Sequence, residues 1–181
     1  LQIGEILYKI TNAIVIPLYY KGVMYGFYSR NIYDKTFYTY MHESNIGYKM
    51  WNWFGIDKNE PCYIYEGIFD AISGGLPNSV AAIGGKIPDE RLKELKYPVF
   101  VLDNDAVGHE NSLAYSKKWH KIYLQPNMYP EKDMNELLLS GKVESIPDLI
   151  LNNIYQGISA QIQISGKKSG GTCKNLAKPR K

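Results

Sequence analysis

The sequence predicts an α/β protein in which a small mixed α+β subdomain precedes a mostly parallel sheet flanked by helices. Between residues 61 and 141, short apolar runs alternate with helical segments, which is typical of βαβ units. Before residue 59, aromatic residues gather in two apolar runs joined by Lys21-Gly22, which indicates a hairpin. Hydrophobic residues make up 45% of the 181 residues and charged residues 22%, so a wholly disordered chain is excluded.

The expected elements follow in chain order. The N-terminal subdomain (1–58) has predicted strands at 13–20, 23–28 and 37–40. The central domain (59–145) has predicted strands at 62–66, 80–83, 99–103 and 121–124, and predicted helices at 67–74, 89–95, 108–119 and 134–139. The remainder (146–181) is expected to be a C-terminal helix or extension with a flexible basic tail. Within it, 158–165 alternates like a stray strand, and 166–181 has the composition of a disordered segment.

The basic character of the chain is confined to its tail. The chain has 21 basic and 18 acidic residues, and six of the basic ones follow Ser165 with no acid, so the body carries 15 − 18 = −3. Net charge is therefore weak evidence for nucleic-acid binding. No apolar run approaches the roughly 20 residues of a membrane span, and no secretory signal is visible. We therefore expect a cytoplasmic protein without a membrane partner.

Two further features concern the chain as a whole. It begins with Leu1 rather than Met, so we expect a fragment or a processed product. Its two cysteines, Cys62 and Cys173, cannot supply a four-cysteine zinc site. Cys62 lies in an apolar strand pattern and is expected to be an ordinary core thiol.

Carboxylates stand where three of the predicted strands end. The first of these strands ends in Glu66, and Asp70 follows one helical turn later. The third ends in Asp103, and Asp105 follows two residues on, so both can point the same way. Asp133 opens the last predicted helix. Functional groups of open parallel sheets cluster at this edge, and oxygen-only ligands favour Mg²⁺ or Mn²⁺. The pattern predicts a metal site.

Structural roles are open alternatives for some of these acids. Asp70 would equally suit the first turn of a helix, Asp133 an N-cap, and Asp89 with Glu90 the start of a helix. Two carboxylates directly after an apolar strand are harder to explain, because they are costly unless solvated or bound to something. A lone D-x-D is weak. E-G-x-x-D, D-x-D-x-x-G and K-D-x-N at successive strand ends form a strong combination.

These motifs resemble those of DnaG-type primases, in particular bacteriophage primases, whose catalytic core contains a TOPRIM domain. The resemblance covers about residues 13 to 141. The E-G-I-F-D segment at 66–70 is similar to the first motif, and D-N-D-A-V-G at 103–108 is similar to the second. K-D-M-N-E at 132–136 resembles the version in phage primase-helicases, although the family often has a second acid where Asn135 stands. The stretch IPLYYKGVMYGFYSRNI, two strands joined by a glycine turn, and the segment YKMWNWFG also resemble primase segments before the first motif.

The resemblance implies synthesis of RNA primers on single-stranded DNA, from ribonucleoside triphosphates, by metal-dependent nucleotidyl transfer during DNA replication. Glu66, Asp103 and Asp105 would be catalytic, and with Asp70 and Asp133 they would hold Mg²⁺ or Mn²⁺. Glu66 is also a candidate general base, and both roles stay open. Six residues would contact the nucleotide or the template: Arg30, Lys35, Lys49, Lys86, Lys132 and Asn135. A replicative helicase and a zinc-binding primase module are the implied partners, and a phage protein would act in the host cytoplasm.

Two other functions compete with this one. A TOPRIM nuclease or topoisomerase-like fragment would cleave DNA. A topoisomerase needs a tyrosine nucleophile in another domain, and none of the 16 tyrosines stands out. A binding module would use the acids only for structure.

Overall fold

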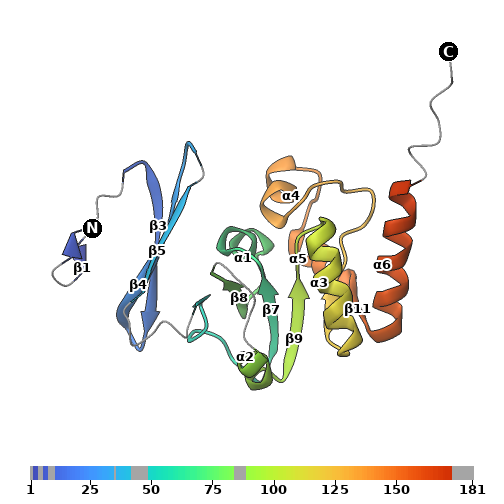
Figure 1. Ribbon diagram of the computed structural model, residues 1–181, viewed down its shortest axis with the longest axis horizontal. Coiled ribbons are helices and arrows are strands. Elements are labelled where there is room, and N and C mark those ends of the chain that lie inside the picture. The colour runs from blue at the N-terminus through green and yellow to red at the C-terminus, as the bar shows by residue number, and fades with distance from the viewer. Residues whose placement is uncertain are drawn as a thin grey trace, which may run out of the picture.

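The computed structural model describes residues 2–3, 6–7, 11–34, 36–41, 49–83 and 89–172, and their side chains between residues 11 and 167. A three-stranded antiparallel sheet stands beside a larger, six-stranded sheet that carries helices (Figure 1). Two short strands, β1 (Gln2–Ile3) and β2 (Ile6–Leu7), pair with each other near the N-terminus. The arrangement confirms the predicted α/β class with a small preceding subdomain.

The small sheet has the order β3-β4-β5, with β3 at Ala13–Tyr20, β4 at Val23–Asn31 and β5 at Phe37–Met41. Lys21 and Gly22 both have positive φ, at 48° and 79°, which is the geometry of a tight hairpin turn. The outer strand β3 contains Pro17, and its register against β4 shifts between Leu18 and Tyr19. All three strands were predicted, and β4 runs three residues further than expected.

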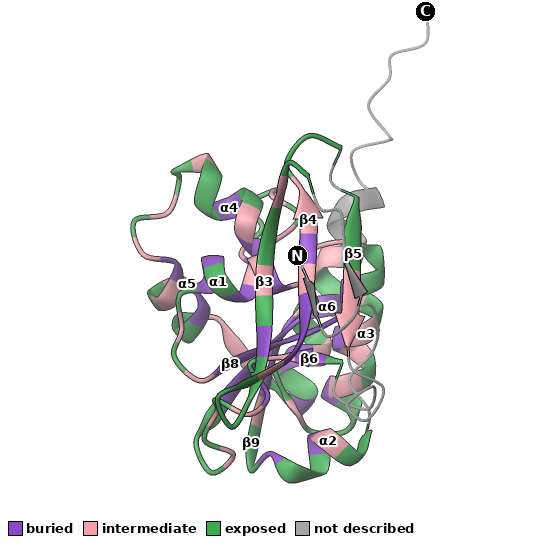
Figure 2. Cartoon of the chain, turned by 90° about the vertical axis from the view of Figure 1, so that its left-hand side faces the viewer, coloured by how far each residue is buried: buried purple, intermediate pink, exposed green. Residues whose placement is uncertain are grey.

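The large sheet has the order β11-β10-β9-β7-β8-β6. Its parallel strands are β7 (Pro61–Tyr65), β8 (Ser79–Ala82), β9 (Tyr97–Val101) and β10 (Lys121–Tyr123). A short antiparallel strand lies at each edge, β6 (Met50–Trp51) and β11 (Ile154–Gln156). Helices cover both faces, so β7 and β9 are apolar on both sides rather than alternating. Figure 2 shows this burial in purple.

The helices divide between the two faces according to the side chains they bury. One face holds α1 (Ile68–Gly74), α4 (Met134–Ser140) and α5 (Ile146–Asn152), which pack against Tyr63, Tyr65 and Val101. The other face holds α2 (Asp89–Glu94), α3 (Ala106–Lys117) and α6 (Gly157–Thr172), which pack against Cys62, Ile64 and Phe100. Cys62 is fully buried as expected, and burial raises the pKa of its thiol to about 12.

The C-terminal part differs from its sequence prediction. Residues 158–165 are not a stray strand, and residues 166–172 continue the same helix, α6. In residues 158–165 the apolar side chains recur at every second position, so they also recur at every fourth position. Residues four apart lie on the same face of a helix. The helix therefore buries Ala160 and Ile164 and leaves Ile158 and Ile162 64% exposed. The rest of the predicted tail, 173–181, lies outside the described residues. Within the described ranges, no helix combines the length and apolarity needed to cross a bilayer.

Candidate active site

Glu66 and Asp103 meet at the edge of the large sheet where its central strands end. β7 and β9 are parallel neighbours with Tyr65 paired to Val101, so the residues that follow them emerge side by side. Glu66 is exposed, but partial desolvation of its carboxyl group, and then the charge of Asp103, raise its pKa. Burial also raises the pKa of Asp103, against the opposing effect of Lys132. The predicted convergence of these two acids is thus present.

Asp105 is fixed by the start of α3. Its carboxylate accepts a hydrogen bond of 2.8 Å from the backbone N–H of Gly108, and this bond lowers the pKa of Asp105. Gly108 itself is required by close packing, because a Cβ there would lie 1.9 Å from the carbonyl oxygen of Asp103. Gly108, the last residue of D-x-D-x-x-G, therefore lets the first turn of α3 pack directly against the backbone of Asp103.

Asp70 stands in the first turn of α1, and Asp133 is the N-cap of α4, where it accepts a 2.7 Å hydrogen bond from Glu136 N–H. Both alternative structural roles are therefore present. Asp70 accepts a 3.3 Å bond from the N–H of Asn135, yet burial and the charges of Asp133 and Asp103 raise its pKa to about 7. Asp70 and Asp133 therefore interact electrostatically with the other acids. The five residues together are called the acidic cluster: Glu66, Asp70, Asp103, Asp105 and Asp133.

Lys132 provides the positive charge of the cluster. Its Nζ lies 3.3 Å from an Asp103 oxygen and 3.4 Å from an Asp105 oxygen, and these two carboxylates raise the pKa of the ammonium. Across the described residues, no three His, Cys, Asp or Glu side chains stand close enough together to hold an ion. Asp103 and Asp105 nevertheless share one cationic partner through oxygen atoms alone, so this pair suits a hard divalent cation.

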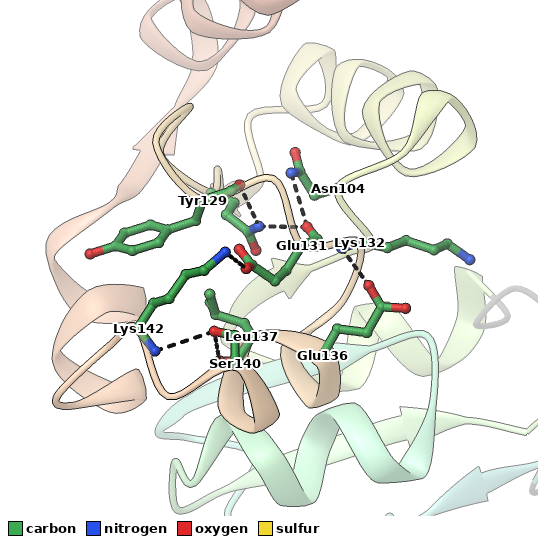
Figure 3. A network of polar contacts seen from close by, with 9 residues as sticks. Asn104, Tyr129, Glu131, Lys132, Glu136, Leu137, Ser140 and Lys142 are labelled. Carbon is green, nitrogen blue, oxygen red and sulfur yellow. Dashed lines mark hydrogen bonds and ion pairs between the residues drawn. The ribbon is translucent and has the colours of Figure 1, made fainter.

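The loop that carries Lys132 is clamped by hydrogen bonds to its backbone (Figure 3). Asn104 donates from its N–H to the carbonyl of Lys132 at 2.6 Å, and from its side chain to the carbonyl of Glu131 at 3.2 Å. Gln125 donates to the carbonyls of Tyr129 and Glu131, at 2.9 and 2.6 Å. The clamp ties the K-D-x-N-E loop to the residue between the two aspartates.

Sequence reasoning missed this clamp. In the sequence, Asn104 is only the middle residue of D-x-D, and Gln125 and Glu131 belong to none of the motifs. Their partners are carbonyl groups that every residue carries, so no residue pattern reveals such contacts. His109 joins the clamp, with its Nε2 at 3.0 Å from the side-chain oxygen of Asn104.

A pocket of about 290 Å³ lies between the small sheet and helices α1 and α4. Arg30 on β4 projects into it, with its Cζ 5.4 Å from the centre of the Phe69 ring on α1. Asn135, whose backbone binds Asp70, lines the pocket as well. The structure therefore brings two of the predicted nucleotide-contacting residues, Arg30 and Asn135, together at this pocket, and Asn135 contacts Asp70.

Of the three remaining predicted contacts, Lys35, Lys49 and Lys86, the structure describes Lys49. Lys49 is exposed, and its carbonyl accepts a 2.9 Å bond from Ile83, just beyond the carboxyl end of β8. Its backbone thus lies at the edge where the acids gather. Lys35 and Lys86 lie outside the described residues, so their placement stays a prediction.

Solved structures share this architecture. The DnaG primase catalytic domain bound to single-stranded DNA matches with a TM-score of 0.63 and 11% identity, covering 84% of this chain and 55% of that one. The zinc-binding and RNA polymerase domains of Aquifex aeolicus primase match at 0.57 and 21%, covering 84% and 43%. The primase fragment of the bacteriophage T7 primase-helicase matches at 0.56 and 15%, covering 78% and 61%.

The chain has the DnaG-type primase fold. It spans roughly half the length of these three primase structures, between 43% and 61%. No protein-family model and no curated protein matches the sequence. Within the primase fold, the three acidic motifs that carried the resemblance come together at one edge of one sheet.

Proposed function

We propose that the chain is the catalytic core of a DNA primase, which makes short RNA primers on single-stranded DNA from ribonucleoside triphosphates. One observation carries the proposal. Within a primase fold, Glu66, Asp103 and Asp105 gather at the carboxyl edge of the sheet around one ammonium group, that of Lys132. The pKa values of Glu66 and Asp103 are raised, and acids perturbed in this way in such a place are typical of a catalytic site rather than of a stabilising one.

The acids suit nucleotidyl transfer, in which a 3′-hydroxyl attacks the α-phosphate of a nucleotide and pyrophosphate leaves. Asp103 and Asp105 would hold Mg²⁺ or Mn²⁺, with Glu66 beside them and Asp70 and Asp133 as supporting charges. When bound, the ion lowers the pKa of the hydroxyl and neutralises charge on the triphosphate. Glu66 has a raised pKa and is therefore also suited to accept the proton of the hydroxyl.

The cations suit phosphate binding. The guanidinium of Arg30 can donate two parallel hydrogen bonds to a phosphate, and the Phe69 ring restricts where it lies. Lys49, Lys35 and Lys86 are proposed to extend the positive charge along the template or the nucleotide. Because the contacts to the template would be mainly to phosphates, binding of single-stranded DNA should weaken steeply as salt rises.

Partners are proposed from the comparisons. The Aquifex aeolicus primase structure contains a zinc-binding domain, and the T7 protein is a primase-helicase. Because this chain spans about half of those structures, we propose that it works with a zinc-binding module and a replicative helicase, on the same chain or separately.

The proposal is tested by one gel. The chain, single-stranded DNA, labelled ribonucleotides and Mg²⁺ or Mn²⁺ are incubated beside an EDTA control and the Asp105→Asn variant. Asparagine is as good an N-cap as aspartate, so this variant should keep the α3 start and the melting temperature. We expect short RNA that requires both the ion and Asp105.

Other outcomes separate the alternatives. Shortened DNA without RNA would identify a nuclease and overturn the proposal. If neither product forms, a pre-annealed primer is supplied, and its extension would show that only initiation needs the missing module. No extension under these conditions would overturn the polymerase function. Unfolding of Asp105→Asn would overturn the metal-site assignment.

A further inference from the structure

The ammonium of Lys132 stands where the first cation of the active site would be needed. It contacts Asp103 at 3.3 Å and Asp105 at 3.4 Å, and these are the two carboxylates assigned above to the ion. An ammonium and a divalent cation attract the same oxygens and repel each other. Both cannot hold this pair of carboxylates at once.

The position of Lys132 is built into the fold rather than left to a free side chain. Its carbonyl accepts the 2.6 Å bond from Asn104, the residue between the two aspartates. Its N–H donates to an oxygen of Glu136, in the first turn of α4, at 3.0 Å. The backbone is therefore held on both sides, and the side chain extends from a fixed point (Figure 3).

The surroundings show why the ammonium is needed in the ion-free protein. Glu66, Asp70 and Asp133 add further negative charge around Asp103, and Lys132 is the cation that acts on both Glu66 and Asp103. Without a partner, Asp103 and Asp105 would repel each other across the start of α3. Lys132 neutralises that pair while more than half of its side chain, 53%, remains exposed and able to move.

We propose that Lys132 is an internal competitor of the divalent cation: its ammonium holds Asp103 and Asp105 together in the ion-free protein and leaves them when the ion binds. The proposal rests on the proposed function, and it assigns a regulatory role to a lysine that the sequence had indicated only as a phosphate contact. The displaced ammonium remains beside the site, where the phosphates of a nucleotide would be its next partner. The lysine would thus lower the affinity for the ion when no nucleotide is present.

The test measures ion binding directly, by Mn²⁺ titration of the whole chain with electron paramagnetic resonance detection of free Mn²⁺. The variant is Lys132→Met, which keeps the length of the side chain and removes its charge. Lys132→Arg keeps the charge. Lys118→Met is the matched control, because Lys118 is a similarly exposed lysine (57%) paired with Asp89 at the opposite end of α3. Asp105→Asn tests the ion site itself.

We expect Lys132→Met to bind Mn²⁺ on the order of tenfold more tightly than the unaltered chain, the effect of removing one positive charge from a partly exposed site. Lys118→Met and Lys132→Arg should bind as the unaltered chain does. Equal or weaker binding by Lys132→Met, with Asp105→Asn still reducing affinity, would overturn the competition and leave the proposed function intact. If Asp105→Asn had no effect on Mn²⁺ binding, this result would contradict the ion site itself and therefore also the competition.

Thermal melting supplies a second measurement that does not depend on catalysis. Without Mn²⁺, Lys132→Met should melt below the unaltered chain, because two carboxylates lose their shared partner. Saturating Mn²⁺ should raise its melting temperature by more than it raises that of the unaltered chain. An equal rise in both would contradict the proposal. Far-UV circular dichroism checks that the variant is folded.

Discussion

The two ends of the central strands carry opposite kinds of electrostatics. Before β7 and β9 begin, Glu94 is bonded to Lys58 and, at 2.6 Å, to Arg91, and these partners lower its pKa. Both cations also lie over the ring of Trp53, at 4.8 and 5.6 Å from its centre. Where the same strands end, Glu66, Asp70 and Asp103 have raised pKa values. At one end the charges are paired, whereas at the other the carboxylates outnumber the ammonium of Lys132, which Asp103 and Asp105 share.

The comparison separates stability from function within one sheet. Paired charges and a buried ring lower the free energy of the folded state. Gathered carboxylates raise it, and such an arrangement persists in proteins where a ligand or a reaction requires it. Substitutions at the carboxyl edge are therefore expected to change activity. Substitutions at the opposite edge are expected to change stability.

The largest contrast should come from Glu66→Gln. This variant should lose on the order of a thousandfold in nucleotide incorporation, because it removes a negative charge and a potential proton acceptor. Its free energy of unfolding should be unchanged or higher, since Glu66 is disfavoured as a charged group in the folded chain. Primer-extension rates and urea unfolding measure the two quantities. A stable Glu66→Gln variant with an unaltered rate of incorporation would contradict the assignment of function to the carboxyl edge.

At the other end, Trp53→Ala should act on stability. Trp53 is 1% exposed, and removing a buried Trp side chain costs about 3–5 kcal/mol of unfolding free energy. Incorporation per folded molecule, measured below the new melting temperature, should stay within about twofold. A large loss of rate in the folded variant would show that the two ends are coupled.

Asp70→Asn should stabilise the ion-free chain at pH 8. The pKa of Asp70 is raised to about 7, so the folded chain holds its proton more tightly than the unfolded chain does. Stability conferred by this group is therefore lost as pH rises from about 4 to 7. The variant avoids that loss and should gain about 1–3 kcal/mol at pH 8 and almost nothing near pH 4. Urea unfolding across this range in EDTA measures it, and a constant difference would contradict the assignment.

The smallest effect is expected from Glu94→Gln, the matched substitution for Glu66→Gln. Its ion pairs are at the surface, so their loss should cost about 0–1 kcal/mol. Incorporation should not change. The two glutamine variants, measured together, would show whether the same chemical change acts on rate at one end and only on stability at the other.

The central domain could be predicted because its strands are buried on both faces and therefore read as unbroken apolar runs between helices. The acids could be predicted because parallel strands end at a common edge. Lys132 could not be placed on Asp103 and Asp105, since that contact depends on a loop held through carbonyl groups. Residues 158–165 of α6 alternate like a strand in the sequence, because apolar residues two apart satisfy both periodicities, and only packing against α3 decides for the helix.

Strand β3, one of the two outer strands of the small sheet, has a consequence for self-association. An edge strand of eight residues is a template on which another chain can add a strand. In β3, Pro17 has no N–H to offer, and the shift between Leu18 and Tyr19 interrupts the spacing of the groups that remain. The edges of the large sheet end in β6 and β11, of two and three residues. Strands β3, β6 and β11 therefore oppose the strand-to-strand aggregation that exposed sheet edges otherwise invite.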